Sequence, residues 1–176
     1  LPQKYNLLAT TMYFLAGRVG ETTSIRVRNI NIKDKLVMLE KSSTKCKESR
    51  QIPIPSKLMS DLKRWIDDNN LEEDDYIFFS SSRNLLYGKG KKKLTNQSVD
   101  EVFRKIFDWV GIIGASSHSF RRSRLTHLME KNFNMKQIMD ISGHKNLLSL
   151  QQYLDSDKAL THKKYRLLIE EEFSYA

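Results

Sequence analysis

Apolar residues at the N-terminal end of the chain recur with helical spacing. The pattern covers residues 3–16 and predicts a mostly buried helix. Gly17 and Gly20 follow it, and because glycine weakens a helix, we expect the helix to end or bend there. The apolar residues that define this helix are Leu7, Leu8, Tyr13, Phe14 and Leu15.

The pattern changes to short apolar or alternating runs over residues 25–55. Two of these runs, 36–39 and 51–54, are separated from their neighbours by polar, turn-like segments at 31–35 and 44–50. Such runs are typical of strands joined by tight turns. The sequence therefore predicts a small antiparallel sheet in the N-terminal third.

A helix that begins after this sheet carries an apolar face formed by Leu58, Leu62, Trp65 and Ile66. Ser56 is the expected N-cap, since a serine side chain can accept a hydrogen bond from the first turn. An acidic loop at 67–75 and a short apolar run at 76–79 are expected next.

The C-terminal half is predicted to be helical throughout. The clearest helix ends at Val110, before Gly111 and Gly114, and begins at Thr95 or Ser98; Ser98 with Glu101 matches a capping box. Further helices are predicted over residues 119–131, 135–141, 147–154 and 158–173. The fold class is therefore α+β, mainly α, with a small antiparallel sheet.

Composition limits the kinds of partner. The 176 residues, 39% hydrophobic, suit one domain, and a net charge of +9 favours nucleic acid or an anionic membrane surface. The apolar stretches fall short of the roughly 18 residues of a membrane span. The single cysteine, Cys46, excludes an internal disulfide and fits a reducing cytosol. Since the chain opens at Leu1, it is interpreted as a fragment or processed form.

Several polar residues that could take part in catalysis occur in short motifs along the chain. His118 and Arg121 lie three apart at a helix start, so both project from one face. His144 closes a helix in Ser142-Gly143-His144, and Tyr153 follows nine positions later. Arg18 lies at a helix–turn junction, and residues 44–50 form a basic hairpin tip.

These pieces, in this order, resemble the catalytic domain of the tyrosine recombinases, which include phage and mobile-element integrases. Residues 16–21 resemble the family's first-arginine motif, residues 45–53 its lysine hairpin, and residues 118–122 its His-x-Leu-Arg motif; Ser142-Gly143-His144 matches Leu-Gly-His. The resemblance implies a helical catalytic core with a three-stranded sheet. It implies as catalytic residues Arg18, Lys45, His118, Arg121, His144 and Tyr153, with Glu21 in support.

The resemblance also implies a role for each group. Arg18 and Arg121 are expected to hold the non-bridging oxygens of a DNA phosphodiester, because guanidiniums are permanently charged and fork-shaped. Tyr153 would form a 3′-phosphotyrosyl bond, and Lys45, with Lys47 as the alternative, would protonate the leaving 5′-oxygen. His118 is the expected proton acceptor or positioning group, and His144 a hydrogen-bond donor to the phosphate.

Further expectations concern partners. Residues 88–93 form a basic loop that either binds an anion or is merely solvated, and no metal or nucleotide cofactor is expected. The resemblance implies an upstream DNA-clamp domain beside a single catalytic domain over 1–176. It also implies a tetrameric synapse through helix 158–173 and a nucleoid location in the cytoplasm of a host cell. The expected DNA-binding residues are Lys47, Arg50, Lys89, Lys91, Lys92, Lys93 and Arg122.

Two other functions stay open at this stage. A type IB topoisomerase resembles this family in fold and residues but relaxes DNA without exchanging partners. A catalytically idle DNA-binding module would use the basic surface without cutting.

Overall fold

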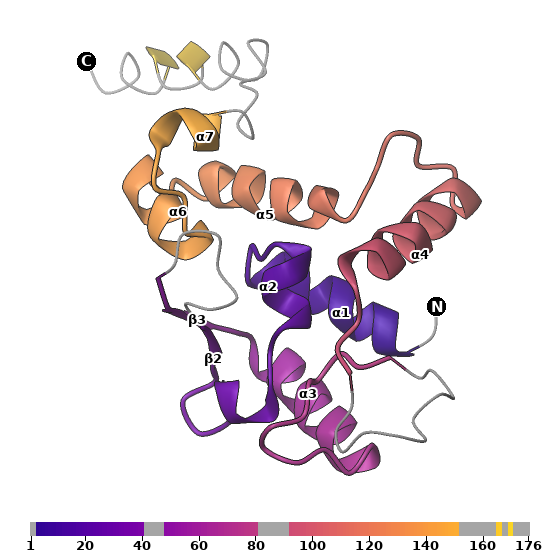
Figure 1. Ribbon diagram of the computed structural model, residues 1–176. Coiled ribbons are helices and arrows are strands. Elements are labelled where there is room, and N and C mark those ends of the chain that lie inside the picture. Colours follow the sequence, from indigo (N-terminus) through magenta and orange to yellow (C-terminus); the bar gives the residue numbers. More distant parts are fainter. Residues whose placement is uncertain (1–2, 41–47, 81–91, 152–164, 167–168, 171–176) are drawn as a thin grey trace.

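The computed structural model describes residues 3–40, 48–80, 92–151, 165–166 and 169–170. It is mainly helical with one small sheet, as the pattern predicts (Figure 1). Helix α1 (Gln3–Phe14) contacts α2 (Val19–Thr23), α3 (Ser56–Asp68) and α5 (His118–Glu130), and it therefore lies between the two halves of the molecule.

The sheet confirms the predicted topology. Its strands, β1 (Ile30–Asn31), β2 (Leu36–Leu39) and β3 (Arg50–Pro53), pair antiparallel in the order β1-β2-β3. Val37 lies opposite Ile30 on one side and Ile52 on the other. A 3-10 turn, η1 (Val27–Asn29), leads into β1. Arg50, the first residue of β3, pairs with Leu39 of β2 at the end of the sheet.

A large apolar core joins the sheet to the first helices. Leu8 and Met12 of α1, Val37 of β2 and Leu62 of α3 are buried in it, together with Phe103 of α4 (Asn96–Trp109). The predicted apolar run at 76–79 adds buried side chains to the same core and places the Phe79 ring on Trp65. This core holds α1 and α2 against the sheet.

A second, smaller core lies under the C-terminal helices. Leu125 and Leu128 of α5 meet Ile138 of α6 (Met135–Ser142) and Leu150 of α7 (Leu147–Gln151). Figure 1 shows α5, α6 and α7 stacked above α1 and α2. The structure confirms the three helices predicted in this region, as far as it describes them. Helix α5 is shifted by one residue at both ends from the predicted 119–131, α6 ends one residue after the predicted 135–141, and α7 lies within the predicted 147–154.

Several predicted helix ends were wrong. Pro55, rather than Ser56, is the N-cap of α3, since its carbonyl accepts from Met59 N; proline has a fixed φ and no N–H to satisfy. The Ser98–Glu101 capping box is absent, because Thr95 Oγ1 accepts from Ser98 N and Glu101 pairs with Lys105.

The segment after α1 also differs from its prediction. The helix ends at Phe14, and Ala16 takes a left-handed conformation with φ 45°. Gly20 lies inside the short helix α2, so it does not end a helix. The acidic loop is shorter than predicted because α3 continues to Asp68.

Candidate active site

Helix α2 begins at Arg18 and brings this arginine and Glu21 together. Arg18 is the N-cap, and its backbone N–H donates to Glu21 Oε2 at 3.1 Å. Arg18 Nη1 donates to Glu21 Oε1 at 2.8 Å. A carboxylate at the third helical position can reach back to the N-cap in this way. The Arg18 side chain is 23% exposed and can still face solvent.

Glu21 is the centre of a buried cluster of charges. Arg50 Nη2 donates to its Oε2 at 2.8 Å, and Arg121 Nη1 lies 3.9 Å from the same oxygen. Burial alone would raise the pKa of the Glu21 carboxyl, but the hydrogen bond and charge of Arg50, followed by those of Arg18, lower it overall. Glu21 is therefore ionised at neutral pH and holds three arginines from separate segments.

Arg121, in the first turn of α5, is fully buried and joins two distant segments. Its Nη1 donates to the Ala16 carbonyl at 2.6 Å, and its Nη2 donates to the Ser142 carbonyl at 3.0 Å. The left-handed turn at Ala16 ends α1 and turns the chain toward α2, and its carbonyl is the one that Arg121 reaches. The guanidinium thus fixes the α1–α2 turn against the end of α6.

His144 follows α6 and is almost fully buried. Its Nδ1 lies 2.7 Å from Ser142 Oγ, which donates to the Ile138 carbonyl, and its Nε2 lies 3.0 Å from Arg121 Nη2. Because a guanidinium can only donate, Nε2 accepts. Burial, followed by the charges of Arg121, Arg18 and Arg50, lowers the pKa of His144 to about 4, so the ring is neutral at pH 7.

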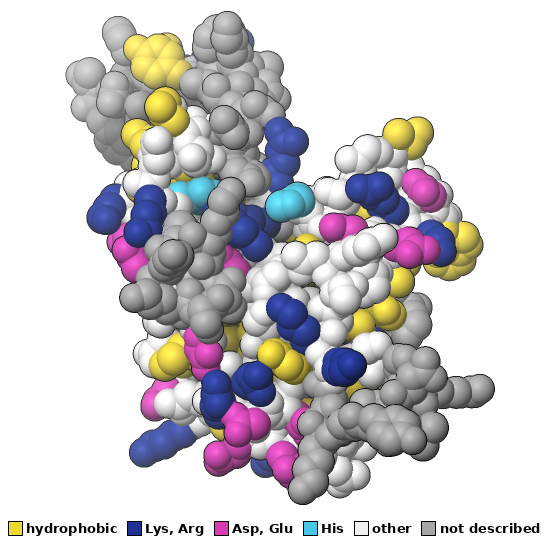
Figure 2. All heavy atoms as spheres, viewed as in Figure 1, with side chains coloured by type: hydrophobic (Ala, Val, Ile, Leu, Met, Phe, Trp, Pro, Cys, Tyr) yellow, Lys and Arg dark blue, Asp and Glu magenta, His cyan; other side chains and the backbone are white. Residues whose placement is uncertain are grey.

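The remaining described candidates are exposed around this cluster. His118 opens α5 and Arg122 follows Arg121, and both face solvent. Lys92 and Lys93 are exposed, and Lys93 Nζ donates to Ser24 Oγ at the end of α2. Figure 2 shows histidine and basic side chains side by side in a hollow of this face.

The remaining predicted residues lie outside the described part of the chain: Lys45, Lys47, Lys89, Lys91 and Tyr153. The structure thus brings together Arg18, Glu21, Arg121 and His144, which the sequence separates by more than 120 positions.

Comparison with known proteins identifies the family of the chain. The sequence profile of the Phage integrase family matches residues 2–159. The chain belongs to this family. A tyrosine recombinase of Pseudothermotoga lettingae is 28% identical over 153 residues, and XerA of Pyrococcus furiosus is 26% identical over 147. These matches cover 86% and 84% of this chain but only 49% and 48% of the relatives, so the chain spans about half their length.

Solved structures confirm the fold of a tyrosine recombinase catalytic domain. The crystal structure of XerA recombinase superposes with a TM-score of 0.76 at 15% identity, over 94% of this chain and 57% of that one. The Tn1549 transposon integrase, solved in complex with a circular intermediate DNA, gives 0.69 at 13% identity, over 94% and 59%. At such low identity the likeness concerns the fold alone.

Two members of the cluster have contacts that the sequence did not suggest. Arg50, predicted to bind DNA, turns inward onto Glu21, and Ser142, which stands where the family motif has Leu, bonds to His144. For Arg50, the position three residues before Pro53 in the family's hairpin motif was a usable signal. For Ser142 no signal existed, because its bond depends on how the chain turns at Gly143.

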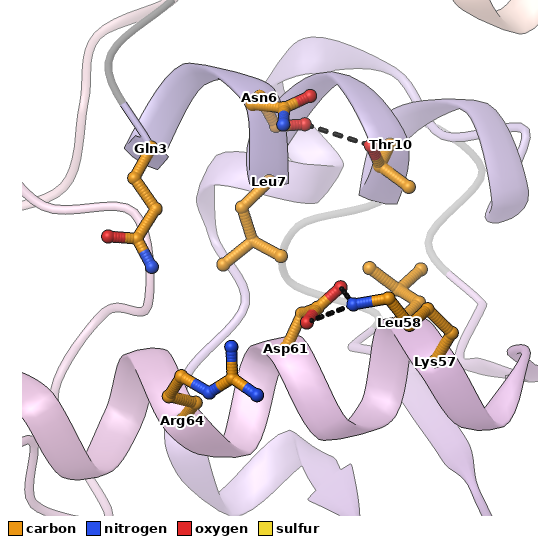
Figure 3. A pocket seen from close by; sticks show the side chains of 8 residues that line it. All are labelled: Gln3, Asn6, Leu7, Thr10, Lys57, Leu58, Asp61 and Arg64. Atoms are coloured by element: carbon orange, nitrogen blue, oxygen red, sulfur yellow. Dashed lines mark hydrogen bonds and ion pairs between the residues drawn. The ribbon is translucent and has the colours of Figure 1, made fainter.

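A cavity of about 470 Å³ borders the cluster, whereas another lies away from it. The bordering cavity lies between the start of β3 and α6, and Arg50, Gly143 and His144 are among its lining residues. The second, between α1 and α3, contains no predicted site residue (Figure 3). Its lining residues are Gln3, Asn6, Leu7, Thr10, Lys57, Leu58, Asp61 and Arg64.

The described residues form neither a cluster of metal ligands nor a helix that could cross a membrane. No three His, Cys, Asp or Glu side chains among them gather as metal ligands would. None of the helices they form combines the length and hydrophobicity needed to cross a bilayer.

Proposed function

We propose that this chain carries the catalytic site of a site-specific DNA recombinase, an integrase that cleaves and rejoins strands through a 3′-phosphotyrosyl intermediate. The observation that carries the proposal is the convergence of Arg18 and Arg121 on the buried Glu21, with His144 bonded to Arg121. With Arg50, three guanidiniums surround one carboxylate, so positive charge remains for an anion. A phosphodiester in its pentavalent transition state is such an anion.

The proposed reaction breaks one ester bond and forms another. Tyr153 Oη attacks the phosphorus, the bond to the 5′-oxygen breaks, and Lys45 donates a proton to that oxygen. His118, exposed at the start of α5, accepts the tyrosine proton. Attack by a 5′-hydroxyl of another duplex reverses these steps. Because the phosphotyrosine retains the energy of the ester, rejoining needs no nucleotide cofactor.

Arg18 and Arg121 differ in how they meet the phosphate. Arg18 is partly exposed, whereas Arg121 is buried and already donates to the Ala16 and Ser142 carbonyls. We infer that Arg18 contacts the phosphate first and that Arg121 does so after the site opens. In its neutral form His144 Nε2 accepts from Arg121, so a donor role toward the phosphate requires that this bond be exchanged.

DNA as the partner is supported by the relatives as well as by charge. The Tn1549 integrase and XerH recombinase were solved with DNA, XerH with its difH substrate. Lys92, Lys93 and Arg122 are exposed, Lys93 beside the end of α2 and Arg122 next to Arg121, and they suit phosphate contacts.

A pool of nicked duplexes with randomised sequence tests the proposal. The protein should form a covalent adduct that survives EDTA and a denaturing gel. Tyr153→Phe should abolish the adduct, whereas Tyr5→Phe, on α1 away from the site, should retain it. Absence of an adduct from the wild-type protein would favour the idle DNA-binding module.

Strand exchange separates the recombinase from a topoisomerase. Two differently labelled duplexes selected from the adduct pool should yield recombinant products. Relaxation of supercoiled plasmid without such products would assign the chain to topoisomerase-like chemistry.

We also propose that four copies assemble on DNA, with helix 158–173 packing on a neighbour. Tyr165 and Ile169, on the described part of that helix, are 63% and 38% exposed, which leaves apolar surface for a partner. Light scattering of DNA complexes should give four protomers for the wild type and fewer for Ile169→Asp. DNA complexes of equal mass for the wild type and Ile169→Asp would contradict this assembly.

A further inference from the structure

Arg50, at the first position of β3, points into the protein instead of toward solvent. Only 12% of its side chain is exposed. Its Nη2 donates to Glu21 Oε2 at 2.8 Å, and its Nε donates to the Ile141 carbonyl at 3.1 Å. Two nitrogens of one guanidinium thus join helix α2 to the last turn of α6.

The end of α6 is shaped around this guanidinium. Gly143 is left-handed, with φ 70°, and a Cβ built on it would lie 2.8 Å from Arg50 Nη1 and 3.1 Å from Cζ. Glycine is therefore needed twice here, for its backbone conformation and for the close approach of Arg50. His144 follows directly, so the position of its ring depends on the same turn.

We infer that Arg50 is a positioning residue that fixes Arg18, through Glu21, and His144, through the end of α6, in one arrangement. This inference rests on the proposed function and concerns the same site. Arg50 joins the two groups that lie on opposite sides of the cluster, and it does so without facing the solvent where DNA would bind. A lysine has the charge but only one nitrogen, so it cannot make both bonds in the fork geometry of arginine.

The electrostatics of the cluster agree with this geometry. Arg50 is the largest of the influences that lower the pKa of Glu21, and it also helps to lower the pKa of His144. The ionised state of the carboxylate therefore depends on Arg50 more than on Arg18, whereas burial and the charges of Arg121 and Arg18 contribute more than Arg50 to the neutral state of the ring.

The substitution Arg50→Lys tests the inference, because it keeps the positive charge but cannot make both hydrogen bonds, to Glu21 and to the Ile141 carbonyl. We expect the dissociation constant for DNA to stay within about twofold and the slope of log K against log salt to be unchanged. Single-turnover adduct formation should slow by about tenfold or more, since a misplacement of about 1 Å can cost a hundredfold. Arg26→Lys is the matched control, because Arg26 also makes two guanidinium hydrogen bonds to a distant part of the chain, to the Asp74 carbonyl and Tyr76 Oη, but away from the site.

A measurement without DNA separates this inference from the proposed function. In the free protein, the ring-proton resonances of His144 should shift in Arg50→Lys and stay in place in Arg26→Lys. If Arg50→Lys does not fold, Arg50→Gln, whose amide can still donate to the Ile141 carbonyl, is measured in the same way.

Three outcomes would overturn the inference. A weaker DNA complex with a salt slope reduced by about one would make Arg50 a phosphate contact. An unchanged cleavage rate would remove its effect on the site. An unchanged His144 resonance would show that it positions nothing there. A wild-type protein that forms no adduct would instead contradict the proposed function.

Discussion

The two halves of the molecule are held together in different ways. Among the described residues, the core shared by α1, α3, α4 and the sheet contains 18 buried hydrophobic side chains, whereas the core under α5, α6 and α7 contains five. The larger core can fix its elements by apolar burial alone. The smaller one is joined to the first half by apolar contacts of Phe120 and Ile141 and by polar bonds that include those of Arg121 and Arg50.

The candidate site lies at this junction. Arg18 and Glu21 belong to the larger half, His144 to the smaller, and Arg121 bonds to both. Buried ion pairs stabilise weakly as a whole, but removing one partner is costly because the other charge is left buried. The charges that would bind a phosphate thus also fix the orientation of the two halves.

The largest effect is expected from Arg121→Ala, which breaks this junction. It removes a buried guanidinium from the Glu21 cluster and leaves the Ala16 and Ser142 carbonyls without it, so we expect a loss of about 3–5 kcal/mol in the free energy of unfolding. Adduct formation should fall by about a hundred- to a thousandfold. Urea denaturation and single-turnover cleavage measure both.

Its neighbour provides a control for that variant. Arg122→Ala removes an exposed guanidinium one position away and should change the free energy of unfolding by less than about 0.5 kcal/mol. Equal destabilisation by the two substitutions would contradict the junction role of Arg121.

Glu21→Gln tests whether the central carboxylate holds the arginines. Its carboxylate is buried and bonds to Arg18 and Arg50, so we expect a loss of about 3–4 kcal/mol in the free energy of unfolding at pH 7. The folded protein lowers the pKa of Glu21, and this contribution is therefore complete above the unfolded value and disappears as pH falls through the folded one. Between pH 7 and pH 3, the free energies of unfolding of the wild type and the variant should converge. A difference that stays constant over this range would contradict the role of Glu21.

His144 should make the stability of the junction depend on pH in a different range. With a pKa of about 4 in the folded protein and 6.5 unfolded, it stays neutral while the unfolded chain takes up a proton, so stability falls between pH 6.5 and 4. This loss in the free energy of unfolding amounts to roughly 3 kcal/mol. His144→Asn should remove this part of the pH dependence. His127→Gln, at an exposed position on α5, should preserve it.

The smallest effect is expected outside the junction, from Lys93→Gln. Lys93 is exposed and belongs to neither core, so we expect only a lower DNA affinity and a salt slope reduced by about one. Cleavage at saturating DNA should stay at the wild-type rate. Lys63→Gln on α3 is the control, and a similar effect there would show that only the overall charge matters.

Local structure was predictable where local chemistry decides it. The order of helices and strands followed from apolar spacing, since each element buries one face whatever its neighbours are. The predicted cap at Ser56 and the Ser98–Glu101 capping box were wrong, and Pro55 and Thr95 are the caps instead. More than one nearby residue could begin each helix, and the packing of the flanking chain selects between them.

For the site, the sequence determined which residue types occur and in what order. The motifs around Arg18, His118, Arg121 and His144 were sufficient to predict the family, since each lies in a short motif and the motifs follow one another in the family's order. The roles of Lys45 and Tyr153 stay predictions.

Only the tertiary structure decided what these residues do to one another. It turned Arg50 away from solvent onto Glu21, buried Arg121 between Ala16 and Ser142, and made His144 neutral. The physical reason is that hydrogen bonds and charge interactions act over a few ångströms, whereas the residues involved lie more than 120 positions apart in the chain. Sequence spacing governs neighbours on one helix, but the packing of two cores brings α2, β3, α5 and α6 together at one carboxylate.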